Sequence, residues 1–142
     1  MEVALAEARL AAEHREVPVG AAILGPDGML LASAHNEIER RHDPTAHAER
    51  LAITAACAAC GTSRLPAGSL IGVTLEPCAM CAGAIVLARA SFLVFGALDP
   101  KAGACGSLRD IVRDERLNHR VVILAARRGR ECGDLLTKFF RE

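Results

Sequence analysis

Two short segments about thirty residues apart contain the side chains of this chain that could carry out chemistry. The first is His47-Ala48-Glu49 and the second is Pro77-Cys78-Ala79-Met80-Cys81. Together they supply one imidazole, two thiols and one carboxylate. A catalytic zinc site uses three protein ligands, an open fourth position for water and a nearby base. A structural zinc site would fill the fourth position with another Cys or His, so a Glu in its place favours catalysis.

The spacing of these groups also predicts how they meet. Cys78 and Cys81 are three residues apart at the expected first turn of a helix, so their side chains share one face. The N-terminus of that helix favours the thiolate, which is the form that binds metal. We expect His47 in the first turn of another helix, and parallel βα units bring helix N-termini to the same sheet edge. Glu49 is either a proton shuttle or only a favourable acidic residue in a first turn.

A further CxxC segment, Cys57-Ala58-Ala59-Cys60, offers a competing interpretation. Seventeen residues separate it from Cys78, a spacing typical of a four-cysteine zinc ribbon. However, it lies near the end of an Ala-rich predicted helix, roughly 15–20 Å from His47, so one zinc ion cannot bind both. A thioredoxin-like redox role would leave the imidazole and the carboxylate unexplained. We expect the cysteines outside the site to be small buried side chains: Cys57, Cys60, Cys105 and Cys132.

Length and composition indicate a soluble globular protein. The 142 residues predict a single domain over 1–142, and 51% hydrophobic with 24% charged residues is ordinary for this class. No apolar run approaches the ~20 residues of a membrane span. The N-terminal segment lacks the basic and apolar regions of a secretory signal. We therefore expect a cytoplasmic protein with reduced thiols and no membrane contact.

Charge is distributed unevenly along the chain although the net charge is zero. Residues 1–100 carry 7 basic and 11 acidic groups, and residues 101–142 carry 10 basic and 6 acidic groups. The basic C-terminal third is either an electrostatic footprint for a phosphate backbone or a set of scattered solvated arginines. Arg109, Arg113 and Arg116 have the spacing of one face of a helix, so they could form a basic face there.

Hydrophobic periodicity and turn residues predict alternating strands and helices. The expected strands are 17–24, 29–34, 69–75, 92–96 and 121–125. The expected helices are 2–15, one from Asp43-Pro44 to about 59, 77–88, a short one within 108–116, and 131–141. Residues 37–42 read as a loop. This order predicts an α/β sandwich whose sheet is largely parallel after the first hairpin.

The motifs and much of the remaining chain resemble a known family. The similar segments are 15–21, 41–49, 74–84, 94–97, 118–121 and 139–141. They resemble the zinc-dependent nucleoside and nucleobase deaminases, and within these the bacterial tRNA adenosine deaminases. The resemblance implies a three-layer α/β/α sandwich of the cytidine deaminase type with a five-stranded mixed sheet. It also implies deamination of adenosine to inosine at the wobble position of a tRNA anticodon, by a homodimer.

The resemblance assigns a role to each site residue. One zinc ion per chain is held by His47, Cys78 and Cys81, and Glu49 carries protons from zinc-activated water to the purine and the departing amine. The residues implied in substrate binding are Asn36 and the Ala48 amide on the purine, Asp99 and Lys101 on the sugar–phosphate, and Phe140 stacked on an anticodon base.

Other interpretations of these residues remain open. Asn36 can be a loop residue that satisfies backbone groups, and Asp99-Pro100 can be only a turn. Phe139 and Phe140 cannot share a helix face, so one is expected in the core, and Phe140 is the favoured stacking residue. The same zinc chemistry also fits a deaminase of a free nucleobase, nucleoside or nucleotide, and a zinc-stabilised binding module would need no turnover. Candidates for the dimer interface are Met80 and residues 82–90.

Overall fold

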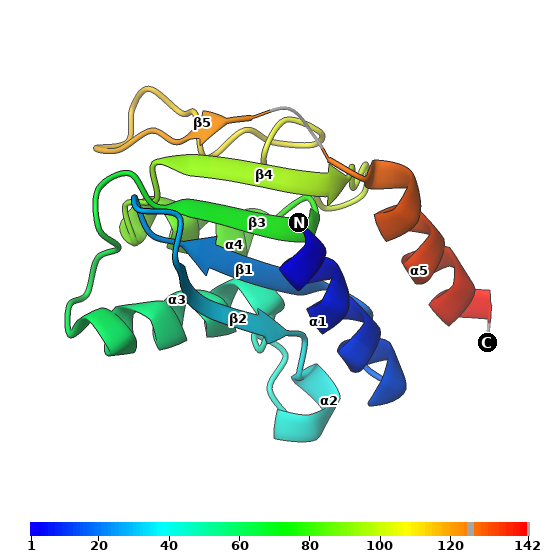
Figure 1. Ribbon diagram of the computed structural model, residues 1–142. Helices are drawn as coiled ribbons and strands as arrows, with labels where there is room; N and C mark the ends of the chain where they lie inside the picture. Colours follow the sequence, from blue (N-terminus) through cyan, green and yellow to red (C-terminus); the bar gives the residue numbers. More distant parts are fainter. Residues whose placement is uncertain (125–126, 142) are drawn as a thin grey trace.

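One mixed β-sheet with helices on both faces positions every candidate site residue (Figure 1). The computed structural model describes residues 1–124 and 127–141. Its strands are β1 (Gly20–Leu24), β2 (Leu30–His35), β3 (Leu70–Leu75), β4 (Phe92–Ala97) and β5 (Val122–Ile123). Its helices are α1 (Glu2–Glu13), α2 (Ile38–Arg41), α3 (Ala48–Cys60), α4 (Ala79–Leu87) and α5 (Gly129–Arg141).

The sheet has the strand order β2-β1-β3-β4-β5. Strand β1 is antiparallel to both of its neighbours, whereas β3, β4 and β5 pair in parallel. Helices α1 and α5 contact each other on one face, and α3 and α4 contact each other on the other face (Figure 1). The predicted three-layer α/β/α sandwich with a five-stranded mixed sheet is therefore confirmed.

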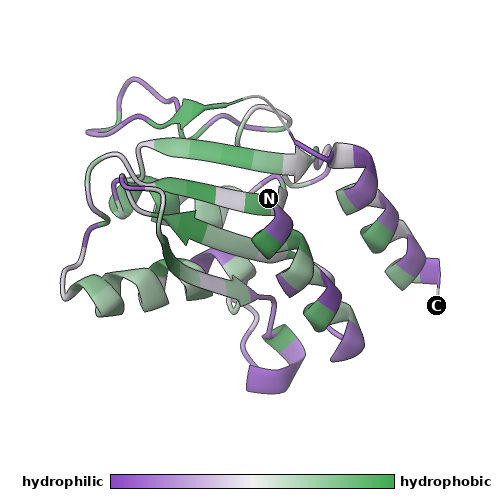
Figure 2. Ribbon diagram, in the orientation of Figure 1, coloured by the Kyte–Doolittle hydropathy of each residue, from purple (hydrophilic) through white to green (hydrophobic). Residues whose placement is uncertain are grey.

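Apolar side chains of the sheet and of the inner helix faces form the core. Figure 2 shows that hydrophobic residues concentrate in the central strands, whereas α2 and the outer side of α5 are hydrophilic. Fully buried large side chains include Ile23, Ile71, Val73, Ile85 and Leu93. Within the described ranges, no helix combines the length and the apolar character needed to cross a membrane.

The topology explains why two helix N-termini meet. Strands β2 and β3 both run against β1, so they point in the same direction on either side of it. The chain enters α3 after β2 and α4 after β3, so both helices begin at the carboxyl edge of the sheet. Ligand sites in open α/β sheets commonly lie at this edge. The predicted convergence of the two helix starts is thus confirmed.

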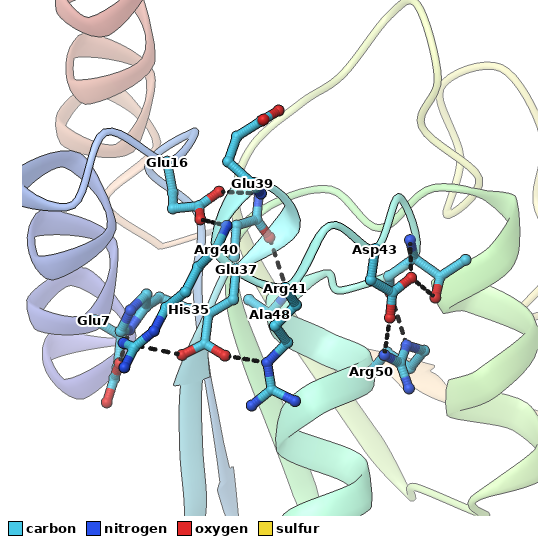
Figure 3. Close-up of polar contacts among 12 residues, drawn as sticks. Glu7, Glu16, His35, Glu37, Glu39, Arg40, Arg41, Asp43, Ala48 and Arg50 are labelled. Atoms are coloured by element: carbon cyan, nitrogen blue, oxygen red, sulfur yellow. Dashed lines mark hydrogen bonds and ion pairs between the residues drawn. The ribbon is translucent and has the colours of Figure 1, made fainter.

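The start of α3 differs from its prediction. Asp43-Pro44 was expected to begin the helix, but α3 begins at Ala48. The Asp43 carboxylate accepts hydrogen bonds from the amide and hydroxyl of Thr45, at 2.8 and 2.7 Å, and so it forms a separate turn. Arg50 pairs with the same carboxylate at 3.2 Å (Figure 3). His47 becomes the N-cap residue, with an extended backbone (φ −77°, ψ 150°).

A short helix, α2, replaces the loop expected at residues 37–42. The buried carboxylate of Glu16 accepts the amides of Glu39 and Arg40 at 3.0 and 2.8 Å (Figure 3). These are unpaired donors of the first helical turn, so Glu16 caps α2 from a distant part of the chain. Local sequence patterns do not contain this contact, because donor and acceptor are more than twenty residues apart.

The helix expected within 108–116 is absent from this described segment, which forms turns instead. Cys105 makes an isolated antiparallel bridge with Asp110. Arg113 pairs with Asp110 at 2.7 Å, and Arg116 pairs with Asp114 at 2.8 Å. The predicted basic helical face is therefore wrong. The Asp114 carboxylate accepts the Arg116 amide at 2.9 Å, and such local side-chain to backbone bonds compete with helix formation.

The last strand and the burial of two cysteines also differ from their predictions. The fifth strand is Val122–Ile123, and residue 125 of the predicted strand lies outside the described residues. Cys105 and Cys132 are buried as expected, whereas Cys57 and Cys60 are only half-buried, with Cys57 packed against the core, so the full burial expected of this pair is wrong.

Gly20 and Gly72 provide a matched test of how closely α1 packs on the sheet. A Cβ at Gly20 would overlap the backbone of Ala4 and Ala8, whereas a Cβ at Gly72 on β3 meets no atom within 4 Å. We expect Gly20→Ala to lower the free energy of unfolding by about 1–3 kcal/mol, as overpacking does. Gly72→Ala should be neutral or slightly stabilising. Urea unfolding of both variants checks this, and equal stabilities would contradict the packing described.

Candidate active site

His47, Cys78 and Cys81 form a compact cluster where α3 and α4 begin. Their ligand atoms lie within 4.8 Å of one another, and in the described ranges no other group of three or more His, Cys, Asp or Glu residues does so. The Nδ1 atom of His47 is 3.7 Å from Sγ of Cys78 and 3.5 Å from Sγ of Cys81. The structure therefore brings together the three predicted ligands and excludes the Cys57-Cys60 pair from this cluster.

These distances fit a zinc ion. Zinc bonds of ~2.3 Å to sulfur and ~2.1 Å to nitrogen at a tetrahedral angle separate the two ligand atoms by roughly 3.6 Å. The two sulfur–nitrogen distances in the cluster bracket this value. Helix geometry produces the arrangement, because His47 and Cys78 are the N-cap residues of α3 and α4 and both have extended backbones.

Hydrogen bonds within the cluster shift the pKa values of all three of its groups. Hydrogen bonds from Cys81 and His47 lower the pKa of the Cys78 thiol to about 3. The bond to Cys78, together with burial, raises the pKa of Cys81, and the Cys78 sulfur raises the pKa of His47. The three groups therefore share protons that a divalent cation displaces on binding.

Glu49 lies beside the cluster in the first turn of α3. Glu49 is only 4% exposed, and burial raises the pKa of its carboxyl group above the usual value. The buried Glu16 and Glu76 differ from it, because each is held by several backbone amides. A buried carboxyl with a raised pKa beside a candidate metal cluster has the character of a general acid and base.

A pocket of about 240 Å³ opens beside Glu49 and the cluster. Its remaining wall residues include Asn36 and Ile38 on one side and Asp99 and Ala102 on the other. Pockets for drug-sized ligands span roughly 300–1,000 Å³, so this one suits a single base. A larger hollow of about 490 Å³ lies between β2 and α3, where Arg41 and Arg50 are paired with acidic neighbours (Figure 3).

Asn36 connects the pocket to the start of α3. Its side chain is almost fully buried, and Oδ1 accepts the Ala48 amide at 2.9 Å. The amide that was expected to contact the purine is therefore already bound to Asn36. Because Oδ1 must be the acceptor of this bond, the NH₂ group of Asn36 is the part left for a substrate.

The other predicted contact residues occupy different places. Asp99 is half-buried at the pocket, and Lys101 is exposed on the same loop. Phe140 is 70% exposed on α5 and packs edge-on against the half-buried Phe139, with ring centres 5.3 Å apart. Phe140 is thus the exposed member of the pair, as predicted, and it is outside the pocket lining.

Glu76 is a wall residue to which the sequence analysis assigned no role. It immediately precedes Pro77-Cys78 and is only 2% exposed, and its carboxylate accepts the amides of Asp99, Cys105 and Ser107. Burial alone would raise its pKa, but these bonds and the Ser107 hydroxyl lower it. Its position before the zinc-ligand segment was the available signal, yet the distant amides that bind it are not visible in the sequence.

Comparison with known proteins agrees with this geometry. Residues 1–97 match the family model of the cytidine and deoxycytidylate deaminase zinc-binding region. The chain is 48% identical over 142 residues to the tRNA-specific adenosine deaminase of Bacillus subtilis (strain 168), covering 100% of this chain and 87% of that protein.

Solved structures show the same relationship. A structure from studies of A-to-I editing by tRNA:A34 deaminases at the wobble position of transfer RNA superposes with a TM-score of 0.90 at 43% identity, over 96% of this chain and 97% of that chain. The guanine deaminase from Nitrosomonas europaea shares the fold, with a TM-score of 0.85 at 21% identity over 99% of this chain and 82% of that chain. With its His-Cys-Cys cluster and adjacent glutamate, the chain belongs to the zinc-binding cytidine and deoxycytidylate deaminase family.

Proposed function

We propose that this protein deaminates adenosine to inosine at the wobble position of a tRNA anticodon, with one zinc ion per chain. The observation that carries the chemistry is the buried Glu49 beside His47, Cys78 and Cys81, in a pocket suited to one base. The substrate follows from kinship, because this chain is similar over almost its whole length to a tRNA-specific adenosine deaminase and to a structure from studies of tRNA:A34 deaminases.

Glu49 is the group that moves protons. Zinc bound by the cluster would act as a Lewis acid and lower the pKa of a water molecule toward neutrality. The Glu49 carboxylate accepts a proton from the attacking water and delivers it to N1 of the purine. It then takes up the remaining proton from the new C6 hydroxyl and donates it to the amine, which leaves C6 as ammonia, so the same carboxyl serves as base and acid. Burial favours this role, because it raises the pKa of the Glu49 carboxyl and so eases its protonation.

The pocket walls select and orient the nucleotide. The NH₂ group of Asn36 donates to an acceptor on the purine, with Oδ1 fixed by the Ala48 amide. Asp99 and Lys101 lie on the loop at the pocket and contact the sugar–phosphate. Phe140 offers an exposed ring on which a splayed anticodon base stacks. Enzymes that modify a base inside folded nucleic acid bind the flipped nucleotide in this way.

We also infer that the protein acts in the cytoplasm as a homodimer. The exposed apolar residues Met80 and Leu87 on α4 support a second copy there, since large apolar side chains on a helix surface favour a partner. Met80 directly precedes the ligand Cys81, so such an interface would border the zinc site.

A free-base deaminase is the alternative function, because the guanine deaminase fold is the same and a base-sized pocket fits either substrate. We expect the protein to form inosine in an anticodon stem-loop RNA whose wobble nucleotide is adenosine, and to deaminate free adenosine poorly. Mass spectrometry of the digested RNA measures the product. The same hairpin with its adenosine moved out of the wobble position is the matched control. Equal or faster turnover of free guanine or cytosine would favour the alternative.

Glu49→Gln tests whether the carboxyl performs turnover. The change preserves size and removes the proton-carrying group, so we expect the deamination rate to fall by about 10²–10⁴-fold or more. Zinc content should be unchanged, because Glu49 is outside the proposed ligand set. Glu13→Gln on the exposed end of α1 is the control and should keep full activity. A Glu49→Gln protein with normal turnover would show that the protein is not a deaminase of the proposed kind.

Cys78→Ala tests the metal site directly. Metal analysis of the purified wild-type protein should give about one zinc per chain, and the variant should lose most of it because one of three ligands is gone. Cys60→Ala removes a half-buried thiol outside the cluster and should retain the metal. Loss of zinc from the Cys60 variant, with retention by the Cys78 variant, would reverse the assignment in favour of a ribbon-like site.

A further inference from the structure

The carboxylate of Glu76 is the centre of the segment that closes one side of the pocket. Its Oε1 accepts the Asp99 amide at 3.1 Å and the Ser107 hydroxyl. Its Oε2 accepts the amides of Cys105 and Ser107 at 3.1 and 3.0 Å. Four donors spread over nine residues therefore meet one buried anion. Hydrogen bonds to a charged acceptor are stronger than neutral ones, so this carboxylate holds both ends of the 99–107 loop.

The loop is shaped to fit around this carboxylate. A Cβ at Gly103 would overlap the Glu76 carboxylate and the Asp99 carbonyl, so this position of the loop has room only for glycine. The loop also bonds to the metal-ligand segment, because the Ala104 amide donates to the Pro77 carbonyl at 2.8 Å. Asp99 uses its own Oδ1 to accept the amides of Lys101 and Ala102, at 3.1 and 3.2 Å.

We propose that Glu76 is a positioning residue that fixes the 99–107 loop at the pocket and thereby sets how the nucleotide's sugar–phosphate is held. This inference rests on the proposed function only for the identity of the substrate. Asp99 and Ala102 are the loop residues at the pocket, and Glu76 binds the backbone of Asp99 itself. Because Glu76 acts through the loop, it governs substrate binding more than the proton transfers at Glu49.

Glu76→Gln changes this anchor with little change in size. A carboxamide has one acceptor oxygen and one donor NH₂ group, whereas four donors converge on the site. If the oxygen stays with the two amides of Cys105 and Ser107, the NH₂ group faces the Asp99 amide, and two donors oppose each other. The Ser107 hydroxyl can rotate to accept, but a backbone amide cannot. The substitution therefore releases the Asp99 end of the loop first.

The test combines amide hydrogen exchange with kinetics on the zinc-loaded, full-length protein. In Glu76→Gln we expect faster exchange in peptides covering residues 99–107 and unchanged exchange in α3. The KM for the anticodon hairpin should rise about tenfold, the cost of losing one charge-assisted hydrogen bond, while kcat stays within about twofold. Gly103→Ala displaces the loop from the other side and should give the same pattern.

Glu16→Gln is the matched control. Glu16 is a buried glutamate that also accepts two backbone amides, but these belong to α2. It should leave the exchange of residues 99–107 unchanged. Wild-type exchange and KM in both Glu76→Gln and Gly103→Ala would overturn the proposal, and so would a fall in kcat with KM unchanged. If the wild-type protein fails to act on the hairpin, the proposed function falls, while faster loop exchange in both variants still supports the anchor.

Discussion

The site depends on one constraint of the sheet. Strand β1 lies between β2 and β3 and runs antiparallel to both, so these two strands point the same way. Because β2 and β3 share a direction, α3 and α4 both begin at one edge, and their N-cap residues His47 and Cys78 face each other. The cap position matters, since its extended backbone turns the side chain away from the helix body. The helix N-terminus also stabilises the thiolate. Strand direction, helix capping and ligand chemistry therefore act at the same point.

The layers and the clustering of His47, Cys78 and Cys81 could be predicted from the sequence because they depend on local and repeated signals. Alternating strand and helix patterns indicated the α/β sandwich, and the spacing from Cys78 to Cys81 indicated a shared helix face. Residues outside these patterns were harder. The turn at Asp43 and the turns replacing the helix within 108–116 arise from side chains that bind nearby groups, and these compete with helix formation.

Contacts between distant segments account for the rest of what sequence reasoning missed. Glu16 caps α2, and Glu76 anchors the 99–107 loop, each through backbone amides more than twenty residues away. A glutamate in sequence looks the same whether it is solvated, catalytic or saturated with amides. In the structure these roles separate, because burial raises the pKa of Glu49 while hydrogen bonds overcome burial and lower that of Glu76.

The reacting groups and the pocket walls come from different parts of the chain. Helix tips supply His47, Glu49 and the cysteines, whereas wall residues such as Asn36 and Asp99 come from segments after β2 and after β4. A fold divided in this way lets substrate preference diverge during evolution while the reaction centre is inherited intact. Glu76, two residues before Cys78, is the point where the two parts join, so drift at this position would be expected to reshape the wall while the reaction centre stays in place.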